Sequence, residues 1–436
     1  MEPGDPIEPS LRGYGQESPW PLERELGMRW YGTAVPGIGG RLRESPEDFV
    51  VEEVASAPGT EGDYLVVRLA KRNWEQQHLV KEIARRLGIS HRRITWAGTK
   101  DRRAVTTQLL SLYRVTEEQV RQVSLRDVTL EPVGRAREGL ALGQLEGNRF
   151  GIQIRGCDPQ DLRERVARVA EGVAAGIPNY YGIQRFGVIR PITHAVGEAI
   201  LREEWERAVL IYIARSFLQE PEGIRAARDA FQESRDVRLA LREFPVHLAY
   251  ERAMLHHLQA APGDYPGALR VLPPRLLSLF VSAFQSWLFN MLLSRRMGSG
   301  TPRTEPVPGD LIFFGDGKSD AVSAANLPAA RLQVTRGRAQ TALFIPGDDF
   351  GAHPGYDTAP LEELLGPRGI GAESFRQASA FVGTAYAGTV RRMLLFPAVT
   401  VQVENDSVHL AFTLSAGEYA TTVCREFMKT DPLQMI

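Results

Sequence analysis

One segment limits what this chain can fold into more than any other: Leu276 to Leu293, LLSLFVSAFQSWLFNMLL, which is almost wholly apolar. Its length is near the lower limit, about 17 residues, for a helix that spans a bilayer. A polar stripe runs along one helical face, formed by Ser278, Ser282, Ser286 and Asn290, with Gln285 beside it. A lone span would expose this stripe to lipid, whereas a buried helix can direct it at hydrogen-bond partners. The segment therefore predicts the core helix of a soluble protein, and no membrane partner is expected.

In the rest of the chain, the type of predicted secondary structure changes along the sequence. A chain of 436 residues is too long for one ordinary core, so two or three domains are expected. Residues 1–40 are rich in Gly and Pro and predict an N-terminal extension. Strand patterns follow Arg41 and return at Val390, whereas residues 188–300 are largely of helical type. Strands and helices mix without a strict strand–helix–strand repeat, which favours an α+β fold with an inserted, largely helical domain.

Alternating hydrophobicity predicts the individual strands. Phe49, Val51 and Glu53 share one face of DFVVEEV, and Phe150, Ile152 and Ile154 share one face of NRFGIQIRG. RITWAG and AVTTQLLSLYRV read as two strands joined across Thr99–Arg103. Asp101 is therefore expected at a strand connection, where functional side chains are often held on a rigid frame.

Helices and turns are marked by their end signals. EQQHLVKEIARRLG places Leu79, Ile83 and Leu87 on one face and stops at Gly88. Asp158-Pro159 predicts the start of another helix, by an N-cap followed by proline. Asn405-Asp406 marks the turn of a hairpin in TVQVENDSVHLAFTL.

Composition excludes several classes of protein. The formal net charge is −1, so affinity for nucleic acid requires a local patch of cations. The 2 cysteines, far apart, exclude a disulfide framework, and no histidine pair carries metal-ligand spacing, so no metal is expected. FFGDGKSD and PGIGGRL each lack a glycine that a phosphate-binding motif requires, so no nucleotide cofactor is expected. The acidic, proline-rich start has no apolar stretch typical of a signal peptide. The low cysteine content suits a reducing cytoplasm, so a cytoplasmic protein is expected.

Two segments carry candidate nucleic-acid contacts. Lysines and arginines crowd the stretch from Lys81 to Arg103, which contains the acids Glu82 and Asp101. By charge alone, a solvated helix face and a nucleic-acid contact are equally good explanations. PNYYGIQRFG, residues 178–187, gathers aromatic residues, Gln184 and Arg185, which is typical of a recognition loop or of aromatics sealing a domain junction.

The sequence resembles the TruD family of tRNA pseudouridine synthases. The resemblance rests on six separated blocks in the family's order, of which AGTKD and NYYGIQRFG are the most specific. The blocks are SPEDFVVEEV (45–54), AGTKDRRAVTTQ (97–108), GNRFGIQIR (147–155), PNYYGIQRFG (178–187), SAFQSWLFN (282–290) and LSAGEYATTVCREF (414–427). Ser415 stands where the family usually has proline, and Tyr181 where phenylalanine is common. The family implies a mixed-sheet catalytic domain over residues 41–187 and 388–436, with a TruD-type insertion over residues 188–387.

The resemblance also implies roles for individual residues. Asp101 matches the aspartate that all pseudouridine synthases share, and Phe150 matches the aromatic that stacks on the target uracil. Four further residues match substrate-binding positions of the pocket: Asn148, Arg43, Glu53 and Lys100. The RNA-binding candidates are Arg92, Arg93, Arg102, Arg103, Tyr181, Gln184 and Arg185.

The chemistry of the family explains a carboxylate among cations. Isomerising uridine breaks the C1′–N1 bond, turns the uracil over and rejoins it through C5, which needs no redox step and no cofactor. An ionised carboxylate acts as nucleophile or base, and neighbouring cations keep it charged and neutralise phosphates. The target base leaves its stack to enter the pocket, where Phe150 would hold its face. We therefore expect Phe150→Ala to fold normally, and loss of both Arg92 and Arg93 to weaken the salt dependence of tRNA binding.

The resemblance predicts an enzyme that acts on tRNA, at uridine 13 in the region of the D-arm. The oligomeric state is open from the sequence, and a monomer is the default expectation. Two alternatives remain from the residues alone: a catalytically silent RNA-binding protein of the same fold, and a nucleic-acid hydrolase. Retention of Asp101, Asn148 and Phe150 argues against the first. The lack of clustered carboxylates for metal argues against the second.

Overall fold

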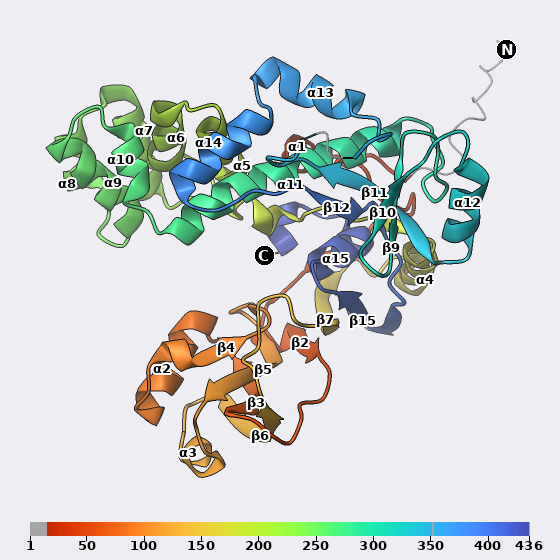
Figure 1. Cartoon of the computed structure of the whole chain (residues 1–436), viewed down its shortest axis with the longest axis horizontal. Helices are drawn as coiled ribbons and strands as arrows, with labels where there is room; N and C mark the ends of the chain where they lie inside the picture. Colours follow the sequence, from red (N-terminus) through yellow and green to blue (C-terminus); the bar gives the residue numbers. More distant parts are fainter. Residues whose placement is uncertain (1–14, 351–352, 436) are drawn as a thin grey trace. The chain divides into compact units, whose positions relative to one another are not determined.

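The computed structural model describes residues 15–350 and 353–435 (Figure 1). The chain forms two compact units: a sheet unit, Gly32–Ile177 with Leu395–Ile436, and a helix-rich unit, Met1–Tyr31 with Pro178–Leu394. The sequence places the corresponding boundaries after residues 40, 187 and 387. Residues 1–14, which belong to the predicted extension, lie outside the described residues; residues 15–31 belong to the helix-rich unit.

The sheet unit is built on a nine-stranded sheet whose main path runs β14-β15-β7-β2-β5-β3-β6. The short strands β1 and β4 pair with β7 and β5. Only the β2–β5 pair is parallel among the described pairings of this sheet, so the sheet is mixed and the fold is α+β, as predicted. The strands are β1 (Gly39–Arg41), β2 (Phe49–Val54), β3 (Tyr64–Arg72), β4 (Ile94–Trp96), β5 (Val105–Tyr113), β6 (Val128–Ala136), β7 (Gly147–Cys157), β14 (Thr400–Glu404) and β15 (Ser407–Ser415).

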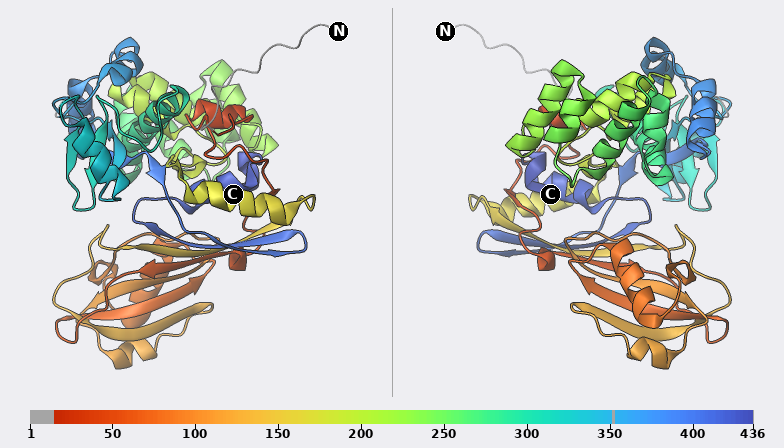
Figure 2. Two further views of the ribbon diagram at one scale, coloured as in Figure 1. Left: turned by 90° about the vertical axis from the view of Figure 1, so that its right-hand side faces the viewer. Right: turned by 90° about the vertical axis from the view of Figure 1, so that its left-hand side faces the viewer.

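Two hydrophobic cores cover this sheet. One lies between β2, β7 and β15 and the helices α4 (Leu162–Ala174) and α15 (Ala420–Met428), and contains Phe150, Ile152 and Ile154. The other packs α2 (Gln76–Leu87) on β3 and β5, and Figure 2 shows this orange helix lying across the strands. A short helix, α3 (Glu117–Arg121), and the 3-10 turns η2 (Pro46–Asp48), η3 (His91–Arg93) and η6 (Pro432–Met435) complete the unit.

Most local predictions are confirmed in the sheet unit. α2 stops at Gly88, whose φ of 65° is the left-handed conformation that glycine adopts readily. The hairpin of β14 and β15 turns at Asn405-Asp406. The helix start at Asp158-Pro159 was wrong: α4 begins at Leu162, because the Asp158 carboxylate accepts from the Gln160 amide in a turn.

The helix-rich unit contains eleven helices among the described residues, and the longest of them is α11 (Pro274–Gly298). The others are α1 (Pro21–Glu25), α5 (Thr193–Leu201), α6 (Trp205–Ala214), α7 (Glu222–Ser234), α8 (Val237–Glu243), α9 (Ala249–Ala260), α10 (Tyr265–Arg270), α12 (Leu327–Thr335), α13 (Ala359–Leu365) and α14 (Ala372–Val382). A four-stranded sheet, which the sequence did not predict as such, has the order β10-β9-β11-β12. Its strands are β9 (Leu311–Phe314), β10 (Ser319–Ala321), β11 (Ala339–Ile345) and β12 (Thr389–Arg392). The 3-10 turns η4 (Ile183–Arg185) and η5 (Gly366–Arg368) lie in this unit, and the two-residue strands β8 (Ile177–Pro178) and β13 (Leu394–Leu395) lie at the unit boundaries.

The prediction of a core helix is confirmed by α11. Its length and apolar character would allow a membrane span, but 67% of its most apolar window is buried. Asn290 donates to the carbonyls of Leu26 and Tyr181, and Ser286 accepts from Arg185. Ser282 differs, because its hydroxyl bonds to the preceding turn of its own helix. The polar stripe thus fastens neighbouring segments to a buried helix.

Candidate active site

Asp101 lies in the loop between β4 and β5, at the predicted strand connection. Its side chain is 52% exposed, and its carboxylate Oδ2 accepts a hydrogen bond of 2.8 Å from Nη2 of Arg43. The backbone carbonyl of the same residue accepts a second bond, also 2.8 Å, from Nζ of Lys71. A charged group is therefore presented to solvent while its side chain and its main chain are both held by cations.

Arg43 is a buried cation with a constrained backbone. Its φ of 58° lies in the left-handed region, which is unfavourable for a residue with a β-carbon and is often retained at functional sites. The guanidinium carbon lies 4.0 Å from the centre of the Phe49 ring, within range of a cation–π interaction. Phe49 and Asp101 together orient the guanidinium.

Lys100 and Glu53 form a buried ion pair next to Asp101. Nζ of Lys100 lies 2.6 Å from Oε2 of Glu53, and the two side chains are 4% and 1% exposed. Oε1 of Glu53 accepts from the Leu109 amide at 3.3 Å. The pair therefore links β2 and β5 to the Asp101 loop. Both side chains are too buried to contact RNA phosphates directly.

The register of β2 and β7 places the predicted residues Asn148 and Phe150 beside residues of β2. Asn148 of β7 is the cross-strand partner of Glu53, and Phe150 is the partner of Val51. The Phe150 ring lies 6.3 Å from that of Phe49 and 5.5 Å from that of Phe412. Contacts thus connect Asp101 through Arg43 and Phe49 to Phe150.

The burial of Phe150 changes one expectation. The residue is 8% exposed and belongs to the core of the sheet unit, so removing the ring leaves a cavity. Normal folding of Phe150→Ala is therefore no longer expected. Little of Phe150 therefore remains accessible to a ligand.

We expect Phe150→Ala to lower the free energy of unfolding by about 3–5 kcal/mol, measured by urea denaturation. If the ring also contacts the substrate, turnover per folded molecule falls as well. Ile152→Ala is the control, since Ile152 is buried on the same face of β7. Equal turnover per folded molecule in both variants would show that Phe150 serves the core alone.

Four buried polar atoms of this region have no hydrogen-bond partner among the described residues: Arg43 Nε, Asn148 Oδ1, Thr106 Oγ1 and Gln108 Oε1. Buried polar atoms usually have a partner, so such atoms are expected where a ligand or water supplies it. Sequence reasoning missed Thr106 and Gln108. The alternation of β5 marks them, because polar residues occupy positions of the buried face that continues to Leu110.

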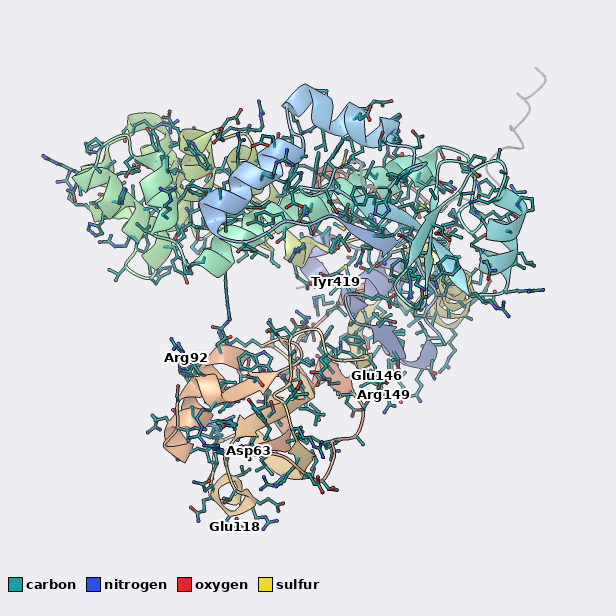
Figure 3. All side chains as sticks on the ribbon, viewed as in Figure 1. Asp63, Arg92, Glu118, Glu146, Arg149 and Tyr419 are labelled. Atoms are coloured by element: carbon teal, nitrogen blue, oxygen red, sulfur yellow. The ribbon has the colours of Figure 1, made fainter. Side chains whose placement is uncertain are left out.

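The basic residues near Asp101 divide into two groups. Arg92 and Arg102 are exposed, and Figure 3 shows Arg92 on the surface of the sheet unit. Arg103 is also exposed and donates to the Glu44 carbonyl at 3.3 Å. Arg93 differs, because its guanidinium donates to the backbone carbonyls of Tyr113 and Arg114. Its Nε and Nη2 donate to carbonyls at the end of β5, so the structure gives Arg93 a role in the fold.

This difference predicts different effects on tRNA binding. Arg92→Ala should weaken binding and reduce the slope of log K against log salt by about 0.9 for one lost phosphate contact. Arg93→Ala should leave that slope unchanged and lower the melting temperature, because two carbonyls lose their donor. Filter binding at several salt concentrations measures both slopes. A reduced salt-dependence slope for Arg93→Ala would show that Arg93 also contacts RNA phosphates.

The three remaining RNA-binding candidates belong to the helix-rich unit. Tyr181 packs its ring against Phe289, and the Arg391 guanidinium lies 4.1 Å from the ring centre. Arg185 donates through Nε to Ser286 at 3.0 Å. Gln184 lies in η4 and is half-buried. The contacts of Tyr181 and Arg185 are those of a segment packed on α11, and contact of the three residues with RNA stays a prediction.

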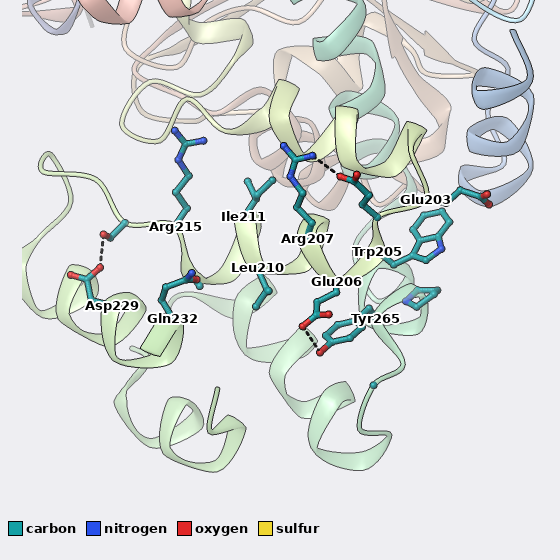
Figure 4. A pocket seen from close by; sticks show the side chains of 15 residues that line it. Glu203, Trp205, Glu206, Arg207, Leu210, Ile211, Arg215, Asp229, Gln232 and Tyr265 are labelled. Carbon is teal, nitrogen blue, oxygen red and sulfur yellow. Dashed lines mark hydrogen bonds and ion pairs between the residues drawn. The ribbon is translucent and has the colours of Figure 1, made fainter. Parts of the chain in front are cut away.

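A cavity of about 960 Å³ lies elsewhere in the helix-rich unit, among α6, α7 and α10 (Figure 4). Several of its polar side chains bond to one another: Arg207 pairs with Glu204, and the Tyr265 hydroxyl donates to Glu206. The residues that line it include none of the predicted site residues. We therefore assign it no part in the chemistry of Asp101.

Comparison with known proteins bears on the whole chain. The family model described as tRNA pseudouridine synthase D (TruD) matches residues 25–427. A protein of Methanococcoides burtonii named "Probable tRNA pseudouridine synthase D" is 38% identical over 434 residues, covering 95% of this chain and 98% of its own. One of the same name from Halobacterium salinarum is 40% identical over 440 residues, covering 95% and 99%.

A solved structure agrees with these relatives. The crystal structure of the putative tRNA pseudouridine synthase D from Methanosarcina mazei superposes with a TM-score of 0.80 at 36% identity. The match covers 94% of this chain and 98% of that protein. The sequence blocks, the mixed sheet and the match along nearly the whole length agree, and this chain belongs to the TruD family of tRNA pseudouridine synthases.

Proposed function

We propose that this pseudouridine synthase isomerises uridine 13 of tRNA and that Asp101 is its catalytic carboxylate. The observation that carries the role of Asp101 is its half-exposed carboxylate, held 2.8 Å from the Arg43 guanidinium on a loop between two strands. The resemblance to the TruD family supports uridine 13 as the target.

The reaction exchanges one glycosidic bond for another. The N1–C1′ bond breaks, the uracil turns, and C5 bonds to C1′; the proton of C5 leaves and N1 carries a proton in the product. Asp101 acts in its ionised form, as nucleophile or as base toward the bound uridine. Arg43 orients the carboxylate and balances its charge.

The neighbouring residues bind the base and support the loop. Asn148 has an oxygen without a protein partner among the described residues, which supports a hydrogen bond from a uracil N–H. Phe150, which keeps 8% of its surface exposed, contacts the ring of the uracil. Lys100 and Glu53 support the Asp101 loop through their buried pair. Arg92 and Arg102 are exposed cations that suit phosphates of the bound tRNA.

The test is to map pseudouridine in a tRNA transcript incubated with the purified enzyme. Pseudouridine at position 13 supports the proposed target, and a transcript with cytidine at that position serves as the matched control. Tritium release from C5-labelled uridine gives the rate. Modification only at other positions would show that uridine 13 is not the target. The role of Asp101 is tested separately, by the Asp101→Asn variant.

A further inference from the structure

Lys71 is a charged residue at a core position. Leu65, Val67 and Leu69 precede it at alternate positions of β3, and all are buried. Lys71 continues this inward face and is itself 1% exposed. Strand alternation thus places an ammonium group where an aliphatic side chain would be expected.

The contacts of Lys71 lead to the catalytic loop. Its Nζ donates to the carbonyl of Trp74 and to the carbonyl of Asp101, each at 2.8 Å. Burial lowers the pKa of Lys71 to about 8, a change that Lys100 favours and that Asp101 and Glu75 oppose. The amine therefore occupies an unfavourable place, and its hydrogen bond to the main chain of Asp101 joins it directly to the site.

We propose that Lys71 is a positioning residue for the reaction, which fixes the main chain of Asp101 while Arg43 fixes its carboxylate. This inference rests on the proposed role of Asp101. Because its main chain and its carboxylate are both held, the Asp101 side chain has little freedom to turn away from the substrate.

The Lys100–Glu53 pair holds the residue before Asp101, and the backbone bonds of the loop fall on other residues than Asp101, which explains why Lys71 matters. The Gly143 amide donates to Ala97, Gln108 donates to Gly98, and the Asn73 amide donates to Ala104. These bonds secure the two ends of the segment. Without Lys71, the carbonyl of Asp101 loses its donor, and a shift of the carboxylate by about 1 Å can cost 10²-fold in rate.

Lys71→Met tests this inference, because methionine keeps the length and apolar stem and removes the donor. We expect kcat for pseudouridine formation to fall about 10- to 100-fold while KM for tRNA stays unchanged. The melting temperature should change by less than about 4 °C, because relief of a buried charge offsets the loss of two hydrogen bonds.

The chain offers a matched control in Lys429. This lysine also donates to two backbone carbonyls, of Thr33 and Val35 at 2.6 Å, and burial likewise lowers its pKa to about 8. Lys429→Met should keep the wild-type kcat per folded molecule. A loss of kcat in Lys71→Met alone supports the positioning role.

Two results would overturn it. One is wild-type kcat in Lys71→Met; the other is a loss that only follows the folded fraction, measured on the same sample. Asp101→Asn is assayed beside them. If it is inactive while Lys71→Met turns over normally, only the inference about Lys71 fails; if Asp101→Asn is active, the proposed function fails with it.

Discussion

Asp101→Asn should reduce pseudouridine formation by about 10²–10⁴-fold or to background, because an amide cannot act as the nucleophile or base that the reaction requires. Its shape and its ability to accept from Arg43 are retained. The side chain is half-exposed, so the melting temperature should change little. Binding of tRNA should be kept, since the exposed cations of the sheet unit are untouched.

The control for this variant is Asp63→Asn. Asp63 is an exposed aspartate of the same unit (Figure 3). It pairs with Arg114 at 3.4 Å. Its substitution should leave the rate of tritium release unchanged. Substantial turnover by Asp101→Asn under conditions where Asp63→Asn is fully active would remove Asp101 from the mechanism.

Lys100→Met should lower the free energy of unfolding by about 3–5 kcal/mol, because it leaves the carboxylate of Glu53 buried and unpaired. Both side chains of this pair are almost fully buried. Adding Glu53→Gln to Lys100→Met should restore much of the loss, since the unpaired charge is removed. Urea denaturation of the two single variants and the double variant measures the coupling.

An exposed pair on the same sheet provides the comparison. Arg68 of β3 and Glu131 of β6 lie 2.9 Å apart with both side chains exposed. Arg68→Met should cost less than about 1 kcal/mol. Similar losses for Lys100→Met and Arg68→Met would mean that water reaches the Lys100–Glu53 pair.

Local patterns in the sequence predicted much of the secondary structure. The alternation in β2 and β7, the stop of α2 at Gly88 and the turn at Asn405-Asp406 follow from backbone and side-chain preferences within a few residues. The polar stripe on α11 predicted a buried helix, although its partners lie far along the chain. The resemblance of sequence blocks pointed to Asp101, Arg43 and Phe150, because a family motif is recognised from consecutive residues and needs no knowledge of their tertiary contacts.

Contacts between distant residues were decided only by the tertiary structure. The β2–β7 register sets Glu53 opposite Asn148, and the β3–β5 pair brings Lys71 beneath the Asp101 loop. Arg92 and Arg93 are adjacent and chemically identical. They differ because the Tyr113 carbonyl lies within hydrogen-bond distance of Arg93, which gives Arg93 a role in the fold. The sequence by itself determined the family, the α+β class and the candidate carboxylate. Only the tertiary structure decided which cations hold that carboxylate and how deeply Phe150 is buried, because burial and hydrogen bonding depend on strands that meet across large separations in sequence.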